Sequence, residues 1–202
     1  GRDITDLGIS IGAGGGGSTI QGLMITGFTL DGINVASGAN NVTIADNWIG
    51  TAGTGTSGHG NANVGNSDDG IEIVGSNALI LGNVITNNND EGIDLKGSGV
   101  TGHVIQGNYI GLDPDGSTSV TGNTDVGIAI ISGAGNTIGG TSVAARNVIS
   151  MNWEGMEINT ADNVVQGNYI GTDATGTLNR GNRLGDGVQI QGAATNTVVG
   201  ST

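Results

Sequence analysis

The hydrophobic positions of the chain recur in a short motif, a Gly followed by two apolar residues that flank one variable position. The motif occurs seven times, at 8–11, 32–35, 70–73, 92–95, 127–130, 155–158 and 187–190. Within each copy every second residue is apolar, which is the period of a β-strand. The seven copies therefore predict seven equivalent strands.

Two further motifs lie between these copies. Asn-x-Ile recurs at 47–49, 83–85, 108–110, 147–149 and 168–170, and an Asn followed by apolar positions precedes most of these, at 41–44, 77–80, 136–138 and 163–165. The shortest unit, from Gly70 to Gly92, is 22 residues. Three strands in a unit of this length are typical of one coil of a parallel β-helix. The sequence predicts an all-β fold, a parallel β-helix with three short strands per coil and about seven to eight coils, forming one domain over residues 1–202.

Equivalent residues of a β-helix stack about 4.8 Å apart in successive coils. We expect the Ile and Val residues to stack in the core and the residue between them to face solvent. We expect the Asn of Asn-x-Ile to form an internal ladder, because an unpaired buried amide costs about 1–3 kcal/mol. The motif glycines are expected at corners of the coils, where the chain needs backbone freedom.

A longer period covers two coils. Residues 107–140 align without gaps with residues 167–200, and long insertions follow three of the Asn-x-Ile motifs, at about 51–69, 112–126 and 172–186. We expect Trp48, Tyr109 and Tyr169, which occur only in coils with an insertion, to pack beneath these loops and the loops to wall one face. Because the repeat pattern runs to the last residue, we expect the chain to be a segment of a longer repeat protein.

Three motifs carry a resemblance to a known family. Asn-Tyr-Ile-Gly-Thr-Asp-Ala-Thr-Gly-Thr at 168–177, Asn-Thr-Ile-Gly-Gly at 136–140 and Ala-Arg-Asn-Val-Ile-Ser at 145–150 resemble repeats of single-stranded right-handed parallel β-helix regions in large bacterial secreted and surface proteins. More distantly they resemble the pectin-lyase-like superfamily of carbohydrate-binding proteins and sugar hydrolases. The resemblance covers essentially the whole chain and implies an extracellular or cell-surface location in bacteria. It says little about activity, because this fold hosts lyases, hydrolases, epimerases and adhesins.

Composition and charge limit the classes of partner that the chain is expected to bind. The 202 residues include 42 Gly, one Pro and no Cys, and Lys+Arg 5 against Asp+Glu 18 gives a net charge of -13. A strongly acidic chain repels nucleic acid and anionic lipid, so we expect no nucleic-acid partner. No apolar run approaches the roughly 20 residues of a membrane span, so we expect no membrane insertion.

The acidic residues follow the Gly motif. Five stand directly before its Gly and three stand two residues after it: Asp31, Asp69, Glu91, Glu154 and Asp186, then Glu72, Asp94 and Glu157. In consecutive coils Glu72 and Asp94 would stack about 4.8 Å apart, where like charges repel unless a cation or a proton intervenes. Three interpretations compete: a solvated face that limits aggregation, oxygen ligands for Ca²⁺, and paired carboxylates that act on a sugar.

The enzyme and calcium interpretations assign the chemistry to different sets of residues. An enzyme would use Asp69, Glu72, Glu91, Asp94 and Lys96, where Lys96, the only lysine, is either a base or a partner that neutralises its neighbours. Calcium would take Glu72 and Asp94, together with Asp113, Asp115 and Asp173 in two Asp-x-(Asp/Thr)-Gly turns that ordinary β-turn chemistry explains equally well.

A carbohydrate platform is predicted at Trp153, beside Glu154 and near Glu157, because an indole ring stacks on sugars. His103, in a predicted strand, is expected to face outward in a structural role. The preferred function is a non-catalytic adhesive or polysaccharide-binding segment. The alternative is a polysaccharide lyase, hydrolase or epimerase with an acidic groove, with calcium as its one candidate cofactor.

Overall fold

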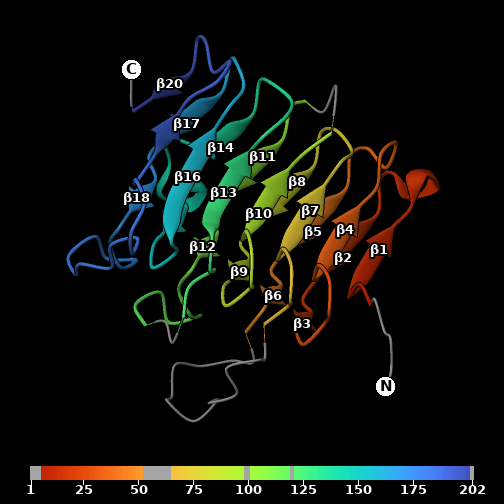
Figure 1. Ribbon diagram of the computed structural model, residues 1–202, viewed down its shortest axis with the longest axis horizontal. Coiled ribbons are helices and arrows are strands. Elements are labelled where there is room, and N and C mark those ends of the chain that lie inside the picture. Colours follow the sequence, from red (N-terminus) through yellow and green to blue (C-terminus); the bar gives the residue numbers. More distant parts are fainter. Residues whose placement is uncertain (1–5, 52–64, 98–100, 119–120, 201–202) are drawn as a thin grey trace.

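The computed structural model describes residues 6–51, 65–97, 101–118 and 121–200, and these form a β-helix with three parallel sheets (Figure 1). Sheet A contains β1 (Ile9–Ile11), β4 (Ile33–Val35), β7 (Ile71–Ile73), β10 (Ile93–Leu95), β13 (Val126–Ile130), β16 (Glu154–Ile158) and β19 (Gln189–Ile190). Sheet B contains β2 (Thr19–Gln21), β5 (Thr43–Ala45), β8 (Leu79–Leu81), β11 (Val104–Gln106), β14 (Thr137–Gly139), β17 (Val164–Gln166) and β20 (Val198–Val199). Sheet C contains β3 (Met24–Ile25), β6 (Trp48–Ile49), β9 (Val84–Ile85), β12 (Tyr109–Ile110), β15 (Val148–Ile149) and β18 (Tyr169–Ile170).

Each of the first six coils contributes one strand to each sheet, and the last contributes β19 to sheet A and β20 to sheet B. The strands pair with their equivalents in the next coil, and the predicted fold is confirmed. The three motifs correspond to sheets A, C and B in that order. The first coil lacks the Asn motifs, and its strands β2 and β3 were therefore not predicted. Two short 3-10 helices, η1 (Ala13–Gly15) and η2 (Val143–Ala145), lie in connections. Within the described ranges no helix is long and apolar enough to cross a membrane.

The core is a set of stacked aliphatic columns. Ile33, Ile71, Ile93 and Ile128 pair in register in sheet A, and each is fully buried. Sheets B and C contribute equivalent columns, which include Ile44, Ile80, Ile105 and Ile138, then Ile49, Ile85, Ile110 and Ile149. Burying each such side chain stabilises the fold by about 1.5–3 kcal/mol.

The Asn ladder is present as predicted. Asn47, Asn83, Asn108, Asn147 and Asn168 follow one another along the stack, and each side-chain amide donates to the carboxamide oxygen of the next at 2.9–3.0 Å. The same oxygens also accept the backbone N–H of the preceding Asn. The buried amides are therefore satisfied, which removes the cost of burying them.

A second ladder was not predicted. It is formed by Asn66, Asn88, Asn123, Asn152 and Asn182, which lie between sheets C and A. These residues have no common neighbouring motif, because insertions of different length precede them. Only their distance from the following Gly of the strand motif, which is three to five residues, could have revealed them.

The outward placement predicted for His103 is wrong. Its side chain is fully buried at the end of a third, shorter ladder, where Asn136 donates to Asn163. His103 Nδ1 accepts the backbone N–H of Ala78 at 3.1 Å, and its Nε2 has no hydrogen-bond partner. Burial lowers the pKa of His103 to about 4. The residue precedes β11 and so points inward, as the Asn residues do.

The motif glycines are needed for a different reason from the one expected. Gly70 and Gly92 do not adopt a positive φ. A Cβ on Gly70 would lie 2.6 Å from the carbonyl oxygen of Gly92, and one on Gly92 would lie 2.6 Å from that of Gly127. The glycine column therefore permits close contact between coils, whereas Gly111, with φ 93, provides the left-handed corner after sheet C.

Candidate functional site

Carboxylates gather on the outside of sheet A and on the connections that lead into it. We call this surface the acidic face, and it comprises Asp31, Asp68, Asp69, Glu72, Asp90, Glu91, Asp94, Asp125, Glu154, Glu157 and Asp186. It arises because sheet A stacks the Gly motif in register, with Ile71 paired to Ile93 and Glu72 paired to Asp94. Acidic residues at fixed positions around the motif Gly are thereby brought into adjacent columns.

Lys96 lies at the centre of the most crowded part of the acidic face. Its Nζ is 2.8 Å from Glu72 Oε2, 2.8 Å from Asp94 Oδ2 and 3.5 Å from Asp69 Oδ2. Lys96 is therefore the cation that separates the stacked pair Glu72 and Asp94. Burial alone lowers the pKa of Lys96, but its hydrogen bonds to Asp94 and Glu72 raise it more, so the net shift is upward. A lysine held in this charged state is a poor proton acceptor.

Asp94 is buried, and the prediction that residues between the core positions of the strand face solvent is wrong here. Only 4 % of the residue is exposed, and the equivalent Ala129 is fully buried. The Lys96 side chain lies against this carboxyl, with Nζ 2.8 Å from Asp94 Oδ2. Asp94 Oδ1 has no hydrogen-bond partner, and burial raises the pKa of the carboxyl despite Lys96.

Asp69 and Glu91 form a pair of equivalent carboxyls in adjacent coils. Burial raises the pKa of both, and a hydrogen bond between the two side chains raises that of Asp69 further while lowering that of Glu91. The backbone N–H of Glu91 also donates to Asp69 Oδ1 at 3.2 Å. The close approach of the two buried carboxyls therefore raises the pKa of both and favours proton binding by the pair. For the stacked pair Glu72 and Asp94, whose repulsion the sequence predicted, the intervening cation is Lys96.

Asp31 extends the acidic face toward the first coils. It is 3 % exposed, its Oδ2 accepts from Asn34 Nδ2 at 2.8 Å, and its Oδ1 has no partner. Asn34 also donates to Glu72 Oε1 at 3.0 Å, which links Asp31 to the pairs of Lys96. Burial raises the pKa of Asp31.

Three residues that the sequence motifs did not single out as site residues form an outer column. Asp68, Asp90 and Asp125 stand two residues before their motif positions, and Asp125 donates its backbone N–H to Asp90 O at 3.3 Å. Oxygens of Asp90, Glu91 and Asp125 lie within 4.8 Å of one another, as do oxygens of Asp69, Glu91 and Asp94. The spacing of Asp68, Asp90 and Asp125 before the motif was visible in the sequence and could have identified them.

Trp153 is the next member of that column. Its backbone N–H donates to Asp125 O at 3.1 Å, and 46 % of the residue is exposed. Beside Trp153, burial and nearby carboxylates raise the pKa of Glu154, and its buried Oε1 has no hydrogen-bond partner. Glu157 Oε1 accepts hydrogen bonds from Asn159 and Gln191. The backbone of the 172–186 insertion lies against Trp153, since Leu184 and Gly185 donate to its carbonyl oxygen.

The turn aspartates Asp113, Asp115 and Asp173 have hydrogen-bond partners within their own loops. Asp115 accepts from the backbone of Ser117 and Thr118 at 2.8 Å, and Asp173 accepts from Thr177 and Leu178 at 2.9 and 3.1 Å. These hydrogen bonds lower the pKa of Asp115 and Asp173. Asp113 is buried in the same type of turn. Within the described ranges, none of the three belongs to a group of acidic side chains whose oxygens converge.

The insertions lie where the sequence placed them. The 112–126 and 172–186 loops follow β12 and β18, and part of the 51–69 loop falls outside the described residues. A Cβ on Gly116 would lie 3.0 Å from Tyr109, and one on Gly176 would lie 2.9 Å from Tyr169. The two tyrosines therefore pack beneath their loops, as predicted. No family of known proteins, no curated protein and no solved structure matches the chain.

Proposed function

We propose that this chain is a non-catalytic, polysaccharide-binding β-helix segment of a large bacterial surface or secreted protein, and that a glycan binds along its acidic face. The observation that carries the proposal is the column formed by Trp153, Asp125 and Asp90. An exposed indole supplies a stacking surface for a sugar ring, and the adjacent carboxylates accept hydrogen bonds from its hydroxyl groups. Because successive coils stack about 4.8 Å apart, successive members of the column would contact successive parts of an extended glycan.

Two features support binding over catalysis. Lys96 is engaged by three carboxylates, which disfavours the role of base that a lyase requires. Oxygens of Asp69 and Glu91 lie within 4.8 Å of each other, which is closer than the roughly 6.5–9.5 Å that leaves room for the attacking water of an inverting glycosidase and the roughly 5–5.5 Å of a retaining one. The alternative, an enzyme that uses these residues on a polysaccharide, predicts turnover that the experiment below measures.

Calcium is the co-ligand that the acidic face would take. Oxygens of Asp69, Glu91 and Asp94 converge within 4.8 Å, and the buried Asp94 Oδ1 lacks a hydrogen-bond partner. Carboxylate oxygens are the ligands that Ca²⁺ prefers, and a divalent ion would offset the repulsion among these carboxylates. We expect Ca²⁺ to raise the unfolding temperature, and Asp94→Asn to abolish that rise.

The test is a screen of the purified chain against neutral and acidic polysaccharides, with and without Ca²⁺, that records both binding and product formation. We expect binding without turnover, and at least about a tenfold loss of affinity in Trp153→Ala. The control is Met24→Ala, which truncates a 52 % exposed side chain on sheet C. Turnover abolished by Asp69→Asn would establish the enzyme instead, and equal losses in both variants would contradict the proposed site.

A further inference from the structure

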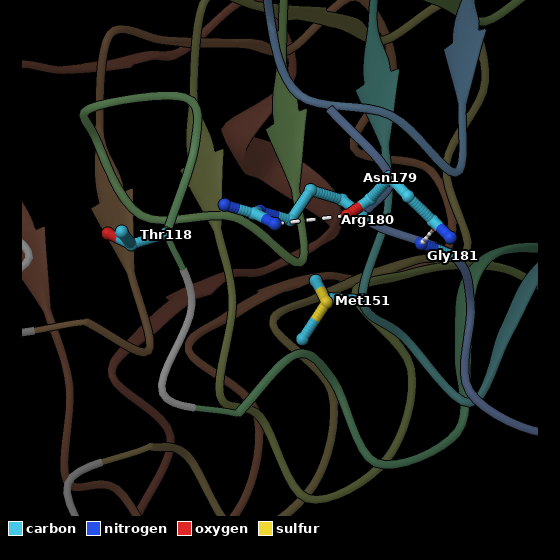
Figure 2. Close-up of a pocket in the computed structure, with 5 residues that line it drawn as sticks. All are labelled: Thr118, Met151, Asn179, Arg180 and Gly181. Atoms are coloured by element: carbon cyan, nitrogen blue, oxygen red, sulfur yellow. Dashed lines mark hydrogen bonds between the residues drawn. The ribbon is translucent and has the colours of Figure 1, made fainter. Parts of the chain in front are cut away.

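Insertions in alternate coils leave a cavity between them. The loops that follow β12 and β18 are separated along the stack by the coil of β15, whose connection to β16 consists only of residues 150–153. A cavity of about 430 Å³ opens above this short connection. Thr118 borders it from the first insertion, Met151 from the short connection, and Asn179, Arg180 and Gly181 from the second insertion (Figure 2).

Arg180 is the charged group of this cavity. Its Nε donates to the carbonyl oxygen of Ser117, and its Nη1 donates to that of Asn179 at 3.0 Å. In Figure 2 the guanidinium extends from the Asn179 side of the cavity toward Thr118. These two bonds fix the plane of the guanidinium, and three of its five N–H groups take no part in them.

Among the described residues, no carboxylate forms a salt bridge that neutralises the charge of Arg180. In the described part of the chain the salt bridges are those of Lys96, and none involves Arg180. The carboxylate of Asp115 is close enough for Arg180 to lower its pKa, but Asp115 is occupied by Ser117 and Thr118. A positive group held by neutral carbonyls at a cavity wall is suited to an anion, because little must reorganise when the anion binds.

We infer that this cavity binds the carboxylate of a hexuronate residue, with Arg180 as its anion-binding group. A guanidinium edge matches a carboxylate with two parallel hydrogen bonds. The Met151 side chain supplies an apolar surface for the C–H face of a sugar ring, and the Thr118 hydroxyl and Asn179 amide border the space for its hydroxyl groups. The volume lies within the roughly 300–1,000 Å³ of small-ligand sites.

The inference rests on the proposed function and adds a chemical requirement to the glycan. A net charge of -13 repels a continuous polyuronate. The ligand is therefore a largely neutral polysaccharide in which uronate residues are spaced apart, so that one carboxylate reaches Arg180 while neutral sugars lie on the acidic face.

Calorimetric titration with methyl glycosides tests the site directly. The probes are the methyl glycosides of glucuronate and galacturonate, each compared with the glucose or galactose analogue that lacks the carboxylate. We expect at least one uronide to bind about tenfold more tightly than its neutral analogue, and Arg180→Gln to remove this preference. The exposed Arg183→Gln is the matched control and keeps it. Equal binding of uronide and neutral analogue, or a preference that survives in Arg180→Gln, would overturn the inference.

Two further measurements keep the outcome interpretable. Because Arg180 joins two loops, Arg180→Gln could unfold the chain, and Arg180→Lys is then used instead. The Lys variant retains the charge but lacks the planar guanidinium. We expect the preference of this variant for the uronide to be weakened. Trp153→Ala separates the two proposals, because it should lose polysaccharide while keeping the uronide preference. Polysaccharide binding with no uronide preference would contradict the inference and leave the proposed function standing. A uronide preference without polysaccharide binding would contradict the proposed function and leave the inference standing.

Discussion

Two kinds of polar column run along this β-helix, and they differ in how well they are satisfied. In the Asn ladder every amide both donates and accepts, so Asn83, Asn108 and Asn147 stack without a net charge or an unmatched group. In the acidic face the stacked carboxylates only accept, so the pKa values of Asp69 and Glu91 are raised and Glu72 and Asp94 share Lys96. The same repeat spacing thus stabilises the fold in the Asn ladder and brings like charges together in the acidic face. Such a local conflict with stability is expected where a surface binds a ligand.

Replacement of a ladder amide should have the largest effect. Asn108→Asp replaces donors to Ile80 O, Gln106 O and Asn147 Oδ1 by an acceptor, and it buries a charge. We expect the free energy of unfolding to fall by about 3–5 kcal/mol in urea titrations. The exposed Asn40→Asp, which keeps the oxygen that accepts from Ser76, should stay within about 0.5 kcal/mol of the original chain. A loss below about 1 kcal/mol in Asn108→Asp would show that the ladder contributes little.

The next effect depends on pH and concerns His103. Its folded pKa of about 4 lies below the ordinary 6.5, so the unfolded chain binds more protons and the His103 contribution, intact above pH 6.5, is lost as the pH falls toward 4. The shift corresponds to about 3 kcal/mol. Protonation would also break the hydrogen bond from Ala78 to Nδ1.

His103→Asn isolates this contribution, because an Asn at this position would extend the Asn136 and Asn163 ladder. Urea unfolding from pH 7 to pH 4 should show a shallower acid loss in the variant than in the original chain. Parallel pH profiles for the two proteins would disprove the role assigned to His103.

Loss of Lys96 should have a smaller effect, because its side chain is 42 % exposed and water screens the pairs. We expect Lys96→Met to lower the free energy of unfolding by about 1–2 kcal/mol at pH 7, since buried Asp94 loses its partner. The loss should shrink at pH 4.5, because Asp94, whose pKa is raised, binds a proton more readily there and then needs Lys96 less. A loss that grows on acidification would contradict the arrangement around Lys96.

The fold could be predicted from the sequence because the residues of the core repeat recur at regular places in each unit, so each residue type indicates its place in the coil. The spacing of Gly70 and Gly92 gives the coil, and Asn-x-Ile gives the internal ladder. Burial could not be predicted in the same way: the alternation that places Asp94 outside the core does not show that Lys96 lies against its carboxyl. The second Asn ladder and the cavity at Arg180 were also missed, because both depend on insertions of unequal length that bring together residues from different coils.

The most direct test of the difference between the two columns is the double variant Asp90→Asn, Asp125→Asn, measured for both stability and polysaccharide affinity. It removes two adjacent charges of the acidic face and leaves amides that pair as the Asn ladders do. We predict that the unfolding temperature stays equal or rises while the affinity falls by about tenfold or more. A lower unfolding temperature with unchanged affinity would show that these carboxylates stabilise the fold and do not bind the glycan.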